Sequence, residues 1–130
     1  AGAIQALEAE GVGYDIISVP GALEIPGALK TAHLSEIHYD GYVALGCVIR
    51  GQTSHYDTVC SESARGLMDL SLQHDLAIGN GILTVENAEQ AWERAEKDKL
   101  NKGGGAALAA LAMARLKADF TSQLLSAGAS

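Results

Sequence analysis

The segment GYVALGCVI, residues 41–49, is an almost uninterrupted apolar run. Such a run is typical of a parallel strand that helices cover on both faces, because it leaves no alternate position for a polar side chain facing water. Two further apolar runs also predict strands: residues 14–19, which end at Pro20-Gly21, and residues 77–83. Together they indicate a parallel sheet.

Segments with helix-spaced apolar residues separate and follow these runs. We expect helices over residues 26–35, 56–74, 86–97 and 105–125, the first of them with Pro26 in its first turn. Strands that alternate with helices are typical of a layered α/β fold with right-handed crossovers.

The first ten residues have helical composition, but no capping residue precedes them and no strand leads into them. We therefore expect this sequence to begin inside a helix, with the first strand of the sheet missing from it. A length of 130 predicts one domain over residues 1–130, in which about 117–130 form the end of the last helix and a tail.

The amino-acid composition argues against two classes of binding partner, nucleic acids and membranes. Hydrophobic residues make up 48% and charged residues 19%, as in a globular protein. Nine Lys and Arg against sixteen Asp and Glu give a net charge of −7, the wrong sign for binding nucleic acid. No stretch approaches the roughly 20 apolar residues of a membrane span, and no export signal opens the sequence. We expect no nucleic-acid or membrane partner and, with Cys47 and Cys60 as reduced thiols, a cytoplasmic location.

The loop RGQTSH, residues 50–55, is the leading candidate for a functional site. It follows the 41–49 strand, and ligands of open α/β sheets bind outside the carboxyl ends of the strands. Backbone N–H groups around Gln52 and Thr53, at the positive end of the next helix dipole, would suit a phosphate. An ordinary strand-to-helix turn capped by Thr53 or Ser54 explains the same residue types equally well.

His55 lies beside this candidate anion site, and imidazole exchanges protons near neutral pH. The alternative is a surface histidine, although His33, His38 and His74 have no comparable setting. Because neither the histidines nor the cysteines have the spacing of metal ligands, we expect no metal site.

Three more charged residues are weaker candidates. Glu24 follows the 14–19 run, where a carboxylate can accept hydrogen bonds from a polyol, but an acidic residue in the first turn of a helix is the simpler interpretation. Arg94, on an amphipathic helix, and Lys102, before three glycines, would usually be solvated charges. The glycines match no nucleotide-binding motif and would loosen the entry to a helix.

Four motifs together resemble the 6,7-dimethyl-8-ribityllumazine synthase family, over about residues 1–116. VPGALEIP (19–26) resembles the family's V-P-G-A-x-E-I/L-P segment, and LGCVIRGQTSHYD (45–57) resembles L-G-x-V-I-R-G-x-T-x-H-x-[DE]. GILTVEN (81–87), which leads to QAWERA (90–95), and NKG (101–103) complete the set.

The resemblance implies a three-layer α/β/α domain with flavodoxin-like strand order, and a transferase of riboflavin biosynthesis. The family condenses 5-amino-6-(D-ribitylamino)uracil with 3,4-dihydroxy-2-butanone 4-phosphate to 6,7-dimethyl-8-ribityllumazine, releasing phosphate and water without metal or organic cofactor. Its sites lie between the subunits of a pentamer. The sequence leaves open whether twelve pentamers close into an icosahedral shell.

Carried over residue by residue, the resemblance makes His55 the proton-transfer residue and places the butanone phosphate on Gln52, Thr53 and Arg94. Glu24 would accept hydrogen bonds from the ribityl hydroxyls. The whole uracil and ribityl pocket would be lined by Ala22, Leu23, Glu24, Cys47, Val48, Ile49, Asn80 and Lys102.

Three departures from the family pattern stand out. The family's first strand, which ends in an aromatic residue that stacks on the uracil, has no counterpart in this sequence. Asn80 stands where many members have an aromatic residue, so stacking on that side would be lost. Residues 103–114 carry no charged side chain, and Ala112 occupies a position that is often acidic.

Two alternatives to an active synthase remain. One is a pentameric assembly block whose apolar helix, residues 105–125, contacts another protein, although a core or native subunit contact is the simpler interpretation of that helix. The other is a flavodoxin-like nucleotide binder, weakened by the lack of a glycine-rich phosphate fingerprint.

Overall fold

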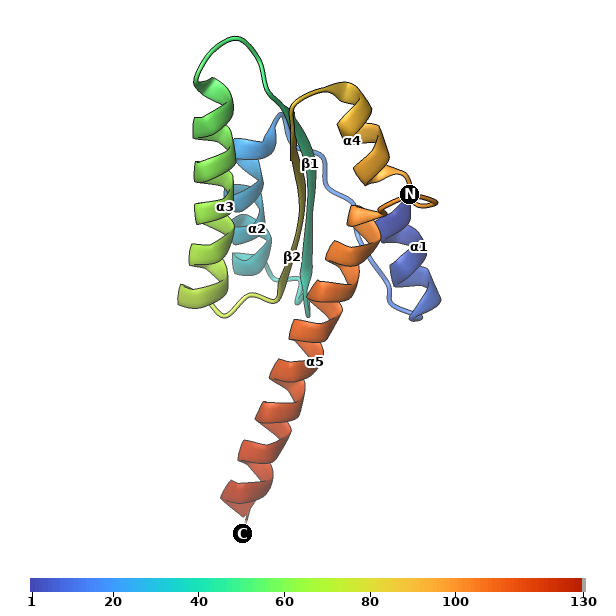
Figure 1. Ribbon diagram of the computed structural model, residues 1–130. Helices are drawn as coiled ribbons and strands as arrows, with labels where there is room; N and C mark the ends of the chain where they lie inside the picture. Colours follow the sequence, from blue (N-terminus) through green and yellow to red (C-terminus); the bar gives the residue numbers. More distant parts are fainter. Residues whose placement is uncertain (130) are drawn as a thin grey trace.

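The computed structural model describes the backbone of residues 1–129 and the side chains of residues 1–122. Helices cover both faces of a short sheet: α2 and α3 lie on one face, and α1, α4 and α5 on the other (Figure 1). The predicted three-layer α/β architecture is therefore confirmed. The elements in chain order are α1 Gly2–Ala9, the 3₁₀ turn η1 Ala22–Glu24, α2 Ile25–Leu34, β1 Tyr42–Ile49, α3 His55–Gln73, β2 Ile78–Val85, α4 Ala88–Ala95 and α5 Lys102–Ala129.

The sheet of the described residues consists of β1 and β2, which run parallel and in register from Tyr42 opposite Ile78 to Ile49 opposite Val85. One more hydrogen bond extends the ladder beyond β1, because the Arg50 N–H donates to the Val85 carbonyl at 2.8 Å. Both strands thus end at the same level.

The core lies between the sheet and its helices. On one face, buried Ile25 and Leu67 pack against Ala44, which is 1% exposed. On the other face, α5 approaches β2 through buried alanines, among them Ala106 and Ala110. Small residues let the helix axis come close to the strand, so the layers pack tightly where β2 meets α5.

The predicted strand over residues 14–19 is wrong, since none of these residues joins the sheet. The segment instead lines a cavity of about 630 Å³, together with β1, α1, α2 and α5. A strand needs a hydrogen-bonding partner along its edge. Residues 14–19 border the cavity and have no strand beside them among the described residues. Ile16 and Ile17 are consequently 69% and 64% exposed.

The expectation that helices cover both faces of the 41–49 strand holds only for its first half. Tyr42 and Ala44 are buried, whereas Leu45 and Ile49 are 49% and 46% exposed. The reason is that β1 pairs on one side only and its other edge borders the cavity.

The first turn of α5 contains the three glycines that were expected to form a loose entry before residue 105. The Asn101 side-chain oxygen accepts a hydrogen bond from the Gly104 N–H at 3.2 Å, as a helix cap does. A side chain at Gly2 would collide with Asn101, so glycine at this position allows α1 to pack against the start of α5.

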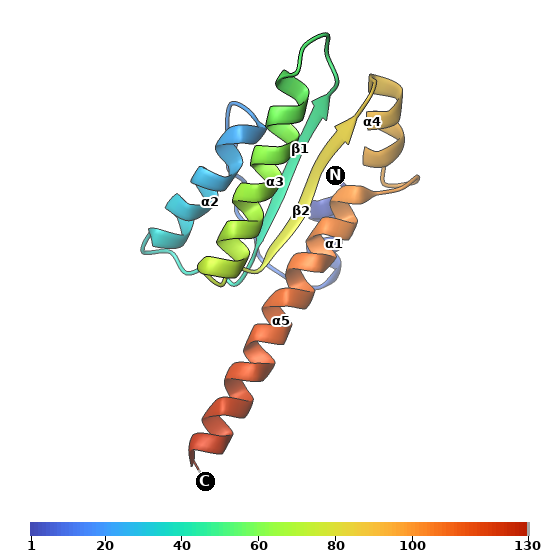
Figure 2. The ribbon, with the colours of Figure 1, turned by 60° about the vertical axis from the view of Figure 1, so that its left-hand side comes forward.

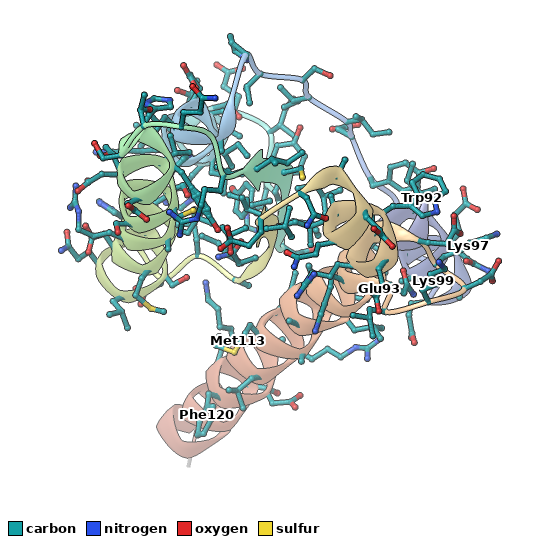
Figure 3. The ribbon with its side chains drawn as sticks, turned by 45° about the horizontal axis from the view of Figure 1, so that its top comes forward. Trp92, Glu93, Lys97, Lys99, Met113 and Phe120 are labelled. Atoms are coloured by element: carbon teal, nitrogen blue, oxygen red, sulfur yellow. The ribbon has the colours of Figure 1, made fainter. Side chains whose placement is uncertain are left out.

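The far half of α5 extends beyond the sheet (Figure 2). It continues to Ala129 rather than ending near residue 125, and Ser130 of the predicted tail lies outside the described residues. Met113, near the middle of α5, and Phe120, in its far half, are 45% and 58% exposed (Figure 3). Among the described helices, none has the length and apolar character needed to cross a membrane.

Candidate active site

The candidate site is the edge of the sheet where β1 and β2 end. Arg50 follows β1 and Glu86 follows β2, and α3 begins with His55 at the same edge (Figure 1). The turn η1, which carries Ala22, Leu23 and Glu24, also lies there, because α2 starts at this edge and runs back along the sheet. Three segments that are distant in the sequence therefore meet at the carboxyl ends of the strands.

The loop Gly51–Ser54 connects β1 to α3 and leaves backbone donors unpaired among the described residues. Its end is held by the α3 turn, in which the Ser54 carbonyl accepts the Asp57 N–H at 3.1 Å and the Thr53 hydroxyl accepts the His55 N–H at 3.3 Å. The Ser54 side chain makes no cap, so of the two predicted capping residues only Thr53 bonds to the helix start. Across the described part of the chain, no acceptor takes the N–H groups of Gln52, Thr53 or Ser54. These donors are free at the positive end of a 19-residue helix.

His55 is exposed at the first position of α3. No described side chain or carbonyl forms a hydrogen bond with its imidazole. Both ring nitrogens therefore lack a partner among the described residues, and an exposed imidazole in this state can deliver a proton to a bound molecule or remove one.

Arg50 is the most connected side chain of the site, although it was not predicted as a site residue. Its Nε lies 2.8 Å from Glu86 Oε2, and an outer guanidinium nitrogen lies 3.6 Å from Asp57 Oδ1. The guanidinium carbon lies 4.3 Å from the centre of the Tyr56 ring. The hydrogen bond to Glu86 and its charge raise the pKa of Arg50 above its usual value. The signal in the sequence was that Arg50 and Glu86 each follow a strand directly.

The Ala22–Glu24 turn and the end of β1 form a second part of the site, and η1 contacts β1. Leu23 is 43% exposed, Glu24 is exposed, and a side chain at Gly21 would approach a Glu24 carboxylate oxygen to 3.1 Å. Among the three predicted pocket residues of β1, Cys47 and Ile49 are exposed and Val48 is half-buried. Ala22 and Cys47 also line the cavity beside β1.

Asn80, Arg94 and Lys102 do not join this group. The Asn80 side chain turns back to its own strand, where its oxygen accepts the Ile82 N–H at 3.0 Å. Arg94 donates to the Gln90 carbonyl within α4 at 3.3 Å, and no ion pair or hydrogen bond of the described residues links it to the loop. Lys102 begins α5, which with α4 lies across the sheet from α3 (Figure 1).

Comparison with known proteins shows to which family the chain belongs. The family model described as 6,7-dimethyl-8-ribityllumazine synthase matches residues 1–118. The chain belongs to the 6,7-dimethyl-8-ribityllumazine synthase family. It is 61% identical over 119 residues to the protein named 6,7-dimethyl-8-ribityllumazine synthase of Bartonella tribocorum, covering 92% of this chain and 79% of that protein. It is 62% identical over 120 residues to the protein of that name from Afipia carboxidovorans, covering 89% and 74%.

Within this lumazine synthase family chain, the residues singled out by the resemblance fall into two groups. Most of them, from the Ala22–Glu24 turn to His55, lie at the carboxyl edge of the sheet. Arg94 and Lys102 lie on helices of the opposite face, and Asn80 lies on β2. Among the described residues, no three His, Cys, Asp or Glu side chains come close enough together to hold a metal ion.

Proposed function

We propose that the chain catalyses the condensation of 5-amino-6-(D-ribitylamino)uracil with 3,4-dihydroxy-2-butanone 4-phosphate to 6,7-dimethyl-8-ribityllumazine, a transferase reaction of riboflavin biosynthesis. Family membership supports this reaction. The structural observation that carries it is the loop Gly51–Ser54, whose free N–H groups lie beside the exposed His55. One reaction partner carries a phosphate, and imine formation, phosphate elimination and ring closure each require proton transfers.

In the proposed mechanism the phosphate binds to the N–H groups of Gln52 and Thr53 at the positive end of α3. The uracil's amine attacks the ketone and forms an imine with loss of water. His55 then moves the protons that accompany phosphate elimination, which leaves an enol that tautomerises to a ketone, and ring closure, in which the second nitrogen attacks this ketone with loss of a second water. Holding the two substrates together supplies much of the acceleration, and none of these steps needs a metal or an organic cofactor.

The uracil and ribityl chain would occupy the surface between the Ala22–Glu24 turn and the end of β1. There the Glu24 carboxylate is free to accept hydrogen bonds from ribityl hydroxyls, since no described side chain pairs with it. The exposed apolar Leu23 and Ile49 offer a surface for the ring. Asn80 supplies no aromatic face, so any stacking on that side is absent.

We further propose that the working form is a homo-oligomer. Arg94 is expected to hold the phosphate, yet within one chain it lies on the helix layer opposite α3. A neighbouring copy that presents its α4 to the loop would bring the two together. A pentamer fits the family, and whether twelve pentamers close into a 60-subunit shell stays open, as does the predicted cytoplasmic location.

The test is to mix the purified chain with both substrates and follow the lumazine absorbance. Product that requires both substrates and appears faster than without protein supports the synthase. No product above the uncatalysed rate would contradict it and favour the assembly block with an altered α5, the alternative that the family relationship does not favour.

A further inference from the structure

Arg50 joins the three elements that surround the phosphate loop. Its backbone extends the ladder between β1 and β2, its side chain pairs with Glu86 at the end of β2, and the same guanidinium contacts Asp57 and Tyr56 in the first turn of α3. The loop Gly51–Ser54 runs from Arg50 to that turn. Both of its ends are therefore fixed by one side chain, whereas the loop's own N–H groups have no partner in the described structure.

The charge balance around Arg50 argues against a role as an anion ligand. Two carboxylates, those of Glu86 and Asp57, lie within 2.8 and 3.6 Å of its nitrogens, and Tyr56 covers the face of the guanidinium at 4.3 Å. An arginine placed in this way makes directional bonds that an ammonium group cannot reproduce. The geometry of Arg50 therefore suits holding the end of β2 and the first turn of α3 together better than it suits binding a further anion.

We propose that Arg50, held by Glu86 and stacked on Tyr56, is a positioning residue that keeps the Gly51–Ser54 loop in the shape that binds phosphate and keeps His55 beside it. This inference rests on the proposed function. It adds that the ion pair between the two strand ends is part of the phosphate site, although neither Arg50 nor Glu86 touches the substrate.

The variant Glu86→Gln separates bracing from simple charge attraction. It removes a negative charge close to the site, so an Arg50 that acts only through its charge would bind phosphate better and lower the KM for the butanone phosphate. If Arg50 braces the loop, the KM for the butanone phosphate should instead rise by about three- to tenfold, with little change in the KM for the aminouracil. Arg50→Lys, which keeps the positive charge, should behave like Glu86→Gln.

Arg65→Gln is the matched control. Arg65 lies on α3, is exposed, and pairs with two carboxylates, those of Glu62 and Asp69, but it is far along the helix from the loop. Its loss should leave both KM values within twofold of the parent. Because exposed ion pairs contribute little to stability, all three variants should fold.

A second readout does not depend on turnover. Hydrogen–deuterium exchange of peptides covering residues 50–57 should be slowed by inorganic phosphate in the parent. In Glu86→Gln the same peptides should exchange about three- to tenfold faster, and more phosphate should be needed to slow them, while Arg65→Gln behaves as the parent.

The outcomes are distinct. A KM that falls or stays within twofold in Glu86→Gln, with unchanged exchange, overturns the positioning role even if the parent makes lumazine. A parent that makes no lumazine, but whose loop is protected by phosphate and loosened by Glu86→Gln, contradicts the proposed function and supports the positioning role. If phosphate does not protect the loop and Glu86→Gln does not loosen it, the positioning role is wrong.

Discussion

The backbone carbonyl of Ala106 in α5 occupies the space in which a side chain at Gly79 of β2 would begin. Gly79 is buried, and its missing side chain lets the helix backbone lie directly on the strand. This contact fixes the height of α5 over the sheet and with it the position of Lys102 at the start of the helix.

Gly79→Ala is therefore expected to destabilise the protein by about 1–3 kcal/mol, because the helix must move away or the strand must bend. Urea unfolding followed by circular dichroism measures the change. Gly27→Ala is the control, since Gly27 lies in α2 with open space around it. Alanine there should be neutral or slightly stabilising, and equal losses in the two variants would contradict the close contact.

His55→Ala is expected to lower kcat by about 10²-fold, the lower end for loss of a general acid or base, because the amine is already nucleophilic and water can relay protons. Phosphate binding should survive, since the loop N–H groups remain. Steady-state kinetics with inorganic phosphate as competitor gives both quantities. A kcat within twofold of the parent together with a tenfold higher Ki would make His55 a phosphate ligand instead.

Arg94→Ala is expected to raise the KM for the butanone phosphate by about ten- to a hundredfold, because a charge-assisted contact to phosphate is worth about 1.5–3 kcal/mol. The KM for the aminouracil should change far less. Equal effects on the two substrates would remove Arg94 from the phosphate site.

Mixing these two variants tests the oligomer. If each site takes His55 from one copy and Arg94 from its neighbour, oligomers reassembled from equal amounts of His55→Ala and Arg94→Ala chains should contain about a quarter of intact sites. Activity should then exceed that of either variant alone. Activity equal to the average of the two variants, or a mass near that of one chain in light scattering, would contradict a shared site.

A hydrogen bond between Tyr39 and Asp15 gives a prediction for pH. The Tyr39 hydroxyl donates to Asp15 Oδ2 at 2.7 Å, and this bond is the main cause of the raised pKa of Tyr39. Because the folded pKa lies above that of the unfolded chain, the bond's contribution to stability is full below about pH 10 and is lost as the pH rises through the folded value. Absorbance titration of the parent against Tyr39→Phe isolates this phenol, and Asp15→Asn should lower its pKa. An unchanged value would show that the bond does not form.

The site was partly predictable from the sequence. Gln52, Thr53 and His55 follow a strand and open a helix, and parallel strands of any α/β fold bring such positions to one edge of the sheet. The part played by Arg50 was not predictable in the same way, because its partner Glu86 lies 36 positions further along the chain (86 − 50). Only the register of β1 with β2 places the two residues opposite each other.

The sequence by itself determined the layered α/β class, β1, the helices and the family, because local periodicity and contiguous motifs are properties of neighbouring residues. The tertiary structure decided that residues 14–19 form no strand, since a strand depends on a partner edge that its own residues do not provide. It also decided that Arg94 lies across the sheet from His55 and that Arg50 braces the strand ends. Such relations depend on how distant segments pack against each other, and that packing cannot be predicted from the spacing of residues along the chain.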